Sequence, residues 1–269
     1  MPARESRVPE GVDSSIPSVA RIYDFLLGGK DNYAVDRAAA QKFIELIPEA
    51  PRIARANRDF LVRSVRFLAQ AGVGQFIDLG AGIPTSPNVH EVARQVRPDA
   101  RVVYVDHDPV VLAHDRALLA TDDQVAVVQA DLREPAAVLG DPGLTGLIDF
   151  GQPVAVLLLS VLHFVSDEEG PAQIVAGYRD RLPSGGYLVM SVGSSENIQD
   201  EETGQRLSDL YRTAGTPIVG RPTEQVRGWF DGCELVEPGL VPLAQWRPDT
   251  LAEARPTRIF ILAGVGRKL

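Results

Sequence analysis

The sequence has little of several features that mark common protein classes. Cys233 is the single cysteine among 269 residues, which excludes an intramolecular disulfide and a cysteine-cluster metal site. Acidic residues outnumber basic ones by 36 to 27, giving a formal net charge of −9. Because phosphate binding needs clustered Lys and Arg, we expect no general nucleic-acid surface, although a local basic groove stays open. We also expect no bound metal.

Long apolar runs are missing as well. The longest, over residues 154–162, is far shorter than the roughly 20 residues needed to cross a bilayer. Nothing near the N-terminus resembles a secretory signal, so we expect a cytoplasmic protein without a membrane segment. With 45% hydrophobic residues, the chain can nevertheless bury a full core.

The chain before residue 73 predicts a helical extension. Residues 1–15 are poor in apolar side chains, and we expect a flexible tail there. From residue 18, apolar residues recur at helical spacing and stop at Gly28 and Gly29, which predicts a helix with a left-handed cap. Two more amphipathic helices are predicted at about 35–47 and 52–71. Residues 16–72 are therefore expected to form an N-terminal helical extension or lid, and residues 73–269 the main domain.

Strands and helices alternate after residue 73, which is typical of an α/β fold. Strands are predicted at residues 76–79, 101–105, 125–129, 154–159 and 187–192, with two final strands at 233–236 and 258–263 that could pair antiparallel. Helices are predicted near residues 88–96, from Pro109, and at 167–181 and 198–214, with turns around 135–143. We predict a doubly wound, mostly parallel, seven-stranded Rossmann-like sheet.

Two of these strands end in an acid. The first ends at Asp78, just before the turn made by Gly80, Ala81 and Gly82, and the second ends at Asp106. Glycines let the backbone turn sharply and approach a ligand, and an acid at the second strand end can accept hydrogen bonds from ribose hydroxyls. This pairing indicates a nucleoside-cofactor site.

Polar side chains also follow the third and fourth strands. Asp131 comes after the third strand, and Ser160 and His163 come after the fourth. Because ligands on such sheets sit beyond the carboxyl ends of the strands, we expect these groups to gather at one site. For any single acid, a helix cap or a solvated loop position is the alternative interpretation.

Charge favours one cofactor over another. A dinucleotide would bring a pyrophosphate to the glycine turn, where Asp78 would oppose it, and Pro84 breaks the dinucleotide fingerprint. S-adenosylmethionine instead brings an ammonium and a sulfonium cation, which an acid attracts. The segment of Gly28, Gly29 and Lys30 also fails as a phosphate loop, because Asp31 replaces the Ser or Thr that binds magnesium.

Several segments resemble a known family. They are residues 20–32, 56–58, 78–85, 238–241 and 246–248. They are similar to an actinobacterial family of S-adenosylmethionine-dependent methyltransferases, long catalogued as a domain of unknown function, and the similarity covers nearly the whole chain after the tail. The resemblance implies a class I methyltransferase fold that binds S-adenosylmethionine or its product S-adenosylhomocysteine. It implies that the glycine turn holds the methionine part, that Asp106 binds ribose, and that Asp131 and Leu132 hold adenine.

Four further residues complete the expected cofactor set. Tyr23 and Gly29 lie in a polar, flexible stretch that we expect to fold over the cofactor; the alternative is a core tyrosine and a plain helix cap. Arg58 could pair with the methionine carboxylate through its guanidinium fork, or be an ordinary solvated arginine. Ser160 joins the set by its place at a strand end.

The chemistry of methyl transfer needs a nucleophile held in line, so proximity and desolvation can supply most of the rate. A hydroxyl acceptor also benefits from a base, and His163 is the candidate catalytic residue; the alternative is a structural histidine. The Asn/Asp-Pro-Pro-aromatic motif of nucleic-acid amino methylases is absent, since residues 160–163 read Ser-Val-Leu-His. A small-molecule acceptor and O-methylation are therefore favoured.

Three hypotheses follow. The first is a methyltransferase acting on a hydroxyl or carboxyl group of a small molecule. The second is a protein that binds S-adenosylmethionine or S-adenosylhomocysteine without catalysis. The third, an NAD-dependent dehydrogenase, is disfavoured by Asp78 and Pro84. The helical extension could serve as a lid, a substrate wall or the surface of a homodimer.

Overall fold

A computed structural model of the chain describes residues 13–119, 122–196, 201–212, 216, 218–255, 257 and 261–269. The tail predicted at residues 1–15 lies outside these ranges up to residue 12. The same holds for residues 198–200 and 213–214 of one predicted helix and 258–260 of the last predicted strand.

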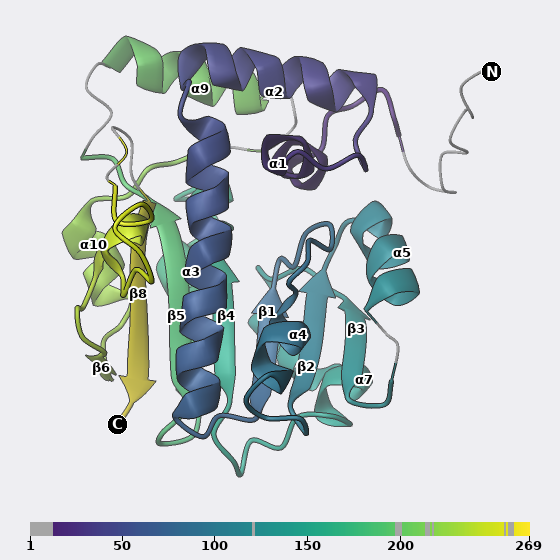
Figure 1. The fold of residues 1–269 in the computed structure, drawn as a ribbon, viewed down its shortest axis with the longest axis vertical. Helices are drawn as coiled ribbons and strands as arrows, with labels where there is room; N and C mark the ends of the chain where they lie inside the picture. The colour runs from purple at the N-terminus through teal and green to yellow at the C-terminus, as the bar shows by residue number, and fades with distance from the viewer. Residues whose placement is uncertain are drawn as a thin grey trace.

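An eight-stranded sheet forms the centre of the molecule (Figure 1). Its strands are β1 (Gln75–Leu79), β2 (Arg101–Asp106), β3 (Val125–Gln129), β4 (Ala155–Leu159), β5 (Tyr187–Gly193), β6 (Cys233–Leu235), β7 (Val241–Pro242) and β8 (Ile261–Lys268). The order is β3-β2-β1-β4-β5-β8-β6, with β7 beside β8. Strands β1 to β5 are parallel and β8 runs antiparallel to β5, which confirms the predicted doubly wound, mostly parallel fold.

The central strands are buried on both faces. All five residues of β1 and all five of β4 are buried, as expected for parallel strands covered by helices on both sides. Gln75 and Asp78 are the polar exceptions in β1, and the register sets Asp78 opposite Tyr104 of β2 and Leu157 of β4. The strand order reverses between β1 and β4, so the ligand crevice is expected there.

The helices follow the sequence pattern closely. They are α1 (Val19–Leu27), α2 (Ala34–Leu46), α3 (Ala50–Gln70), α4 (Val89–Arg94), α5 (Pro109–Leu118), α6 (Pro135–Gly140), α7 (Pro142–Thr145), α8 (Pro171–Arg181), α9 (Glu201–Arg212) and α10 (Thr223–Gly228). Gly28 caps α1 with φ +86°, and the Asp108 side chain accepts from Val110 N at 2.8 Å to cap α5. The expectation of plain turns around residues 135–143 was wrong, because Pro135 and Pro142 each open a short helix.

The helical extension covers one face and one end of the sheet. Helix α3 runs along a face, while α1 and α2 lie beyond the carboxyl ends of the parallel strands (Figure 1). Helix α9 packs against α2, and Leu207 and Tyr211 of α9 join the apolar cluster that α1 and α2 form. The extension thus shares its core with a helix from late in the chain. Among the described residues, no helix is long and apolar enough to cross a membrane.

Candidate functional site

A cavity of about 410 Å³ opens at the carboxyl ends of the first four strands; we call it the strand-end cavity. The structure brings ten of the predicted site residues together around it. They are Tyr23, Arg58, Asp78, Gly80, Ala81, Gly82, Asp106, Asp131, Leu132 and Ser160. Gly29 and His163 do not line it.

The glycine turn after β1 forms one wall of the strand-end cavity. Gly80 and Gly82 have φ of +71° and +66°, in the left-handed region that favours glycine. A side chain at Gly80 would also collide with Val161, because an ideal Cβ would lie 2.5 Å from Val161 Cγ1. Backbone rather than side chain therefore faces a ligand at this turn.

Asp106 is held in a fixed orientation at the end of β2. Its Oδ2 accepts from Gly82 N at 3.0 Å, and its Oδ1 accepts from Asp108 N at 2.9 Å. Burial raises the pKa of Asp106, and these two backbone donors work against that rise. Since each carboxylate oxygen has a second lone pair, the group can still accept from a pair of ligand hydroxyls.

Asp78 lines the same cavity without a hydrogen-bond partner among the described residues. Its side chain is buried, and burial raises its pKa to about 7, with Asp106 adding to the rise and Arg58 opposing it. A buried acid without a protein partner suits a ligand that is cationic or donates hydrogen bonds.

Two arginines beside the cavity form hydrogen bonds with neighbouring groups of the protein. Arg58 Nη2 donates to the carbonyl oxygens of Thr85 and Pro87 at 2.5 and 2.7 Å, which fixes the loop after the glycine turn. Arg133 Nε lies 2.9 Å from both carboxylate oxygens of Asp131. Burial works to raise the pKa of Asp131, but the hydrogen bonds from Arg133 outweigh it and the pKa is lowered. This pairing was not predicted from the sequence.

Helix α1 and the residues just before it cover the strand-end cavity. Tyr23 and residues 17–20 line it, and Ser18 Oγ donates to Asp108 Oδ2 at 2.9 Å. Gly29 has another task, because a Cβ there would overlap the Asp24 carboxylate, which accepts from Asp31 N and Asn32 Nδ2. Gly29 therefore lies in the turn after α1 and does not line the strand-end cavity.

A second, smaller cavity of about 110 Å³ adjoins the first; we call it the apolar cavity. It lies among α1, α2, α3, α9 and the strand ends, and none of the described residues around it is Asp, Glu, Lys or Arg. The wall it shares with the strand-end cavity consists of Val19, Tyr23, Asn57, Ser160 and Phe164.

A chain of hydrogen bonds runs through this shared wall. Ser160 N donates to Ser191 Oγ at 2.8 Å, and Ser191 Oγ donates to Asn57 Oδ1 at 2.7 Å. Asn57 Nδ2 donates to the Tyr23 hydroxyl at 3.0 Å, which in turn donates to the carbonyl of Ala54. Asn57 and Ser191 were missed, although Asn57 stands in a segment that carried the family resemblance. Ser160 has φ +56°, an uncommon conformation for a residue other than glycine.

His163 lines the apolar cavity. Its Nδ1 accepts from Gly193 N at 3.3 Å, so the neutral ring carries its proton on Nε2. Burial, together with the positive charge of Arg221, lowers the pKa of His163 to about 4. The ring is therefore neutral at pH 7 and offers an N–H donor. The predicted catalytic role of His163 stays a prediction.

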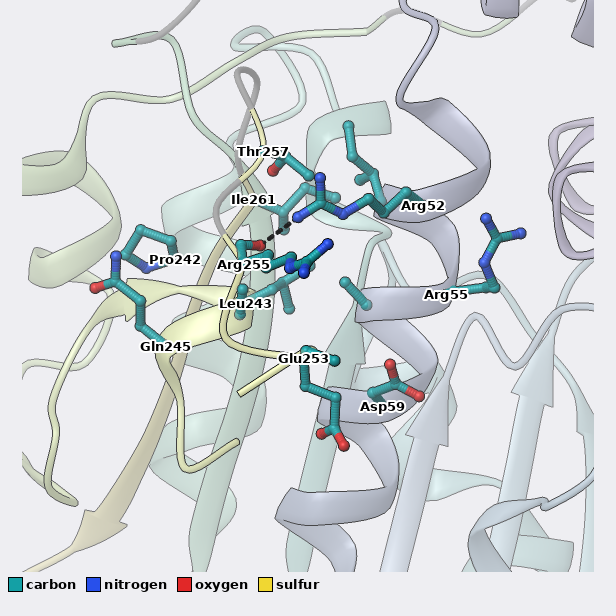
Figure 2. Close-up of a pocket in the computed structure, with 14 residues that line it drawn as sticks. Arg52, Arg55, Asp59, Pro242, Leu243, Gln245, Glu253, Arg255, Thr257 and Ile261 are labelled. Atoms are coloured by element: carbon teal, nitrogen blue, oxygen red, sulfur yellow. Dashed lines mark hydrogen bonds between the residues drawn. The ribbon is translucent and has the colours of Figure 1, made fainter. Parts of the chain in front are cut away.

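A third cavity of about 400 Å³, the outer cavity, lies between α3 and residues 242–257 (Figure 2). Its charged lining residues are Arg52, Arg55, Asp59, Glu253 and Arg255. Ile53 and Ile261 line both the outer cavity and the apolar cavity. Within the described ranges, no group of three or more His, Cys, Asp or Glu side chains is placed to hold a metal ion.

Comparisons with known proteins agree with this geometry. The sequence profile of a family described as S-adenosyl methyltransferase matches residues 5–269. A DUF574 family protein from Streptomyces avermitilis, known from its crystal structure, is 41% identical, with a TM-score of 0.90 over 96% of this chain and 99% of its own. A protein from Thermobifida fusca, described as a candidate methyltransferase, is 45% identical, with a TM-score of 0.89 over 97% and 98%. Among curated proteins, none matches the chain.

Proposed function

The chain belongs to the S-adenosyl methyltransferase family, and from this premise we propose that it transfers a methyl group to a hydroxyl of a small molecule. Its cofactor is S-adenosylmethionine, which sets the dehydrogenase hypothesis aside. The observation that carries the proposal is the shared wall between the strand-end cavity and the apolar cavity. One cavity is suited to the cofactor and the other to the acceptor.

The residues around the strand-end cavity fit this cofactor. Asp106 would accept from the ribose hydroxyls, and the turn at Gly80 and Gly82 leaves room for the methionine part. Asp78, which is buried and has no hydrogen-bond partner among the described residues, would attract the cationic end. Residues 131 and 132 would face the adenine, and Arg58 would hold the loop beside the methionine part.

The apolar cavity would bind the acceptor and position it for methyl transfer. When bound, S-adenosylmethionine supplies a methyl group on a sulfonium that a nucleophile can displace. The chain's own part is to orient the acceptor and exclude water, and the uncharged lining of the apolar cavity serves both purposes.

Two polar groups in the apolar cavity can position the acceptor oxygen. His163 would donate through Nε2–H, since its low pKa and the bond to Gly193 make it a weak base. Ser160 lies in the shared wall, where its hydroxyl reaches the boundary between the two ligands. The acceptor's proton would leave to solvent once the oxygen is methylated.

Calorimetry with S-adenosylmethionine, S-adenosylhomocysteine and NAD tests the cofactor placement. We expect both sulfur compounds to bind and NAD not to bind. Asp106→Asn should weaken binding at least tenfold, because a hydrogen bond to a charged group contributes about 1.5 kcal/mol or more. Asp99→Asn, an exposed change, is the matched control. Full affinity in Asp106→Asn would remove that residue from the site.

Transfer of a labelled methyl group to a library of hydroxyl-bearing metabolites tests the reaction. Labelled product with an ether linkage supports the proposal. Cofactor binding without transfer to any hydroxyl or carboxyl compound would instead favour the hypothesis of a non-catalytic binding protein.

A further inference from the structure

We propose that the outer cavity is the second half of the acceptor site and receives the anionic end of an amphipathic acceptor. The apolar, hydroxyl-bearing end of the same molecule would fill the apolar cavity. This inference rests on the proposed function, because it takes the apolar cavity as the place of methylation.

The two cavities meet at two side chains. Ile53 of α3 and Ile261 at the start of β8 line both of them, and both residues are half-buried. A helix restricts χ1 of an isoleucine, but its χ2 can still change between staggered rotamers, whereas a partition of hydrogen-bonded backbone would be fixed. The boundary can therefore open for a ligand that spans both cavities.

Residues of helix α3 line all three cavities. Asn57 lines the strand-end and apolar cavities, and Ile53 lines the apolar and outer cavities. These residues are four positions apart, so they are neighbours on one face of the helix, separated by roughly 6 Å along its axis. A molecule of one ring with a short tail is long enough to reach from one boundary to the other.

Volume and charge assign an end of the ligand to each cavity. The apolar cavity, at about 110 Å³, is smaller than the apolar cavities of ~150 Å³ that hold one benzene, so it has room for at most a single ring. A charged group could not enter it cheaply, because its described lining residues include no Asp, Glu, Lys or Arg and its His163 is neutral. A charged end must therefore extend into the larger outer cavity.

Guanidinium groups lie on one side of the outer cavity. The side chains of Arg52 and Arg255 lie close together there, with Asp59 and Glu253 on the other side (Figure 2). Arg52 Nη2 donates to the Arg255 carbonyl at 2.6 Å, while its Nη1 lies 3.4 Å from Glu49. Two neighbouring guanidinium groups suit a carboxylate or a similar anion, which can accept several hydrogen bonds at once.

The acids of the outer cavity do not cancel this charge. Glu253 is engaged by Arg63, whose Nη1 lies 2.9 Å from its carboxylate. Arg52 is likewise engaged by Glu49, which leaves Arg55 and Arg255 against one remaining acid, Asp59. The charge balance favours an anionic ligand end over a cationic one.

Two probes that differ in one charge test the inference. Calorimetry on protein loaded with S-adenosylhomocysteine compares para-hydroxyphenylpropanoate with the uncharged para-hydroxyphenylpropanol. We expect the acid to bind at least about fivefold more tightly, the minimum for a charge-assisted bidentate contact. In Arg52→Gln and Arg255→Gln this preference should fall below about twofold, with affinity for the alcohol and for S-adenosylhomocysteine unchanged. Arg116→Gln, exposed on α5, is the matched control and should keep the preference.

A bulky residue at the boundary gives an independent test. Ile53→Trp should fill the passage and weaken both probes while S-adenosylhomocysteine still binds. Equal affinity for the acid and the alcohol, a preference that survives both arginine changes, or binding of neither probe would each overturn the inference. Failure of S-adenosylhomocysteine to bind would instead overturn the proposed function, so the two failures are distinguishable.

Discussion

The side-chain amide of Asn57 donates to the hydroxyl of Tyr23 at 3.0 Å and thereby joins α3 to α1. Both residues stand in the wall between the strand-end and apolar cavities. The other end of the amide accepts from Ser191 of β5, so three separate elements meet at one buried side chain. Asn57 is thus one of the links that hold α1 over the strand ends, together with the hydrogen bond from Ser18 to Asp108.

Replacing this asparagine should lower stability. In Asn57→Ala, the hydroxyls of Ser191 and Tyr23 each lose a buried partner, and we expect a loss of roughly 2 kcal/mol in the free energy of unfolding. Tyr23→Phe should cost less, about 1 kcal/mol, since it leaves the bond between Asn57 and Ser191 intact. Urea denaturation measures both. An unchanged midpoint in Asn57→Ala would contradict the role given to the amide.

Cofactor affinity should depend on pH through Asp78. Its pKa of about 7 means that the carboxyl is neutral at pH 6 and charged at pH 8, where it attracts the cationic cofactor. We expect affinity for S-adenosylmethionine to rise by up to about tenfold over this interval, the equivalent of one pKa unit of coupling. Calorimetry at several pH values measures the rise.

A variant without the titrating group separates this effect from the cofactor's own titration. Asp78→Asn should bind with nearly constant affinity from pH 6 to pH 8, while Asp99→Asn should behave like the unaltered protein. The same rise in Asp78→Asn would assign the pH dependence to another group.

The bounds of the parallel strands could be predicted from the sequence, but those of the last strand could not. Strands β1 to β5 lie within a residue of their predicted bounds, because strands buried on both faces are continuous apolar runs. β8 was predicted at 258–263 and found at Ile261–Lys268. Gly264 and Gly266 weaken its strand signal, yet the Phe230 ring packs against both, and an added Cβ would crowd it.

The site was predictable only in part, for a similar reason. An acid or a glycine that directly follows an apolar strand is visible in the local sequence. Asp78, Gly80 and Asp106 could therefore be predicted from their positions at the strand ends. The hydrogen bond between Asn57 and Ser191 joins residues 134 positions apart, and no local sequence pattern predicts it. The outer cavity likewise forms only because residues 242–245 and 252–255 lie against α3.

Asp115 should make the fold less stable as the pH rises. It is fully buried on α5, and neither carboxylate oxygen has a hydrogen-bond partner among the described residues. Burial, with the nearby charges of Asp106 and Asp78, raises its pKa from 3.8 to about 8. The folded state therefore binds the proton more tightly than the unfolded state. The resulting stability is fully present below pH 3.8 and is lost progressively up to pH 8.

Asp115→Asn removes this titration while keeping the shape of the side chain. We expect little change in stability below pH 3.8 and a gain that grows above it, larger at pH 8 than at pH 5 by at least about 1 kcal/mol, because one pKa unit corresponds to roughly 1.4 kcal/mol. Thermal unfolding from pH 5 to pH 8 measures it. Parallel curves for the variant and the unaltered protein would show that Asp115 does not carry the dependence.

Ser160 stores backbone strain at the boundary of the two ligand cavities. Its φ of +56° costs a residue with a Cβ about 1 kcal/mol that glycine does not incur. Ser160→Gly should therefore be more stable than Ser160→Ala by about that amount, since both lose the hydroxyl and only alanine keeps the strain. If the hydroxyl positions the acceptor, methyl transfer should fall by a similar factor in both variants. Urea denaturation and initial rates on the same preparations separate the two effects, and an alanine variant as stable as the glycine variant would show that the left-handed conformation is not strained.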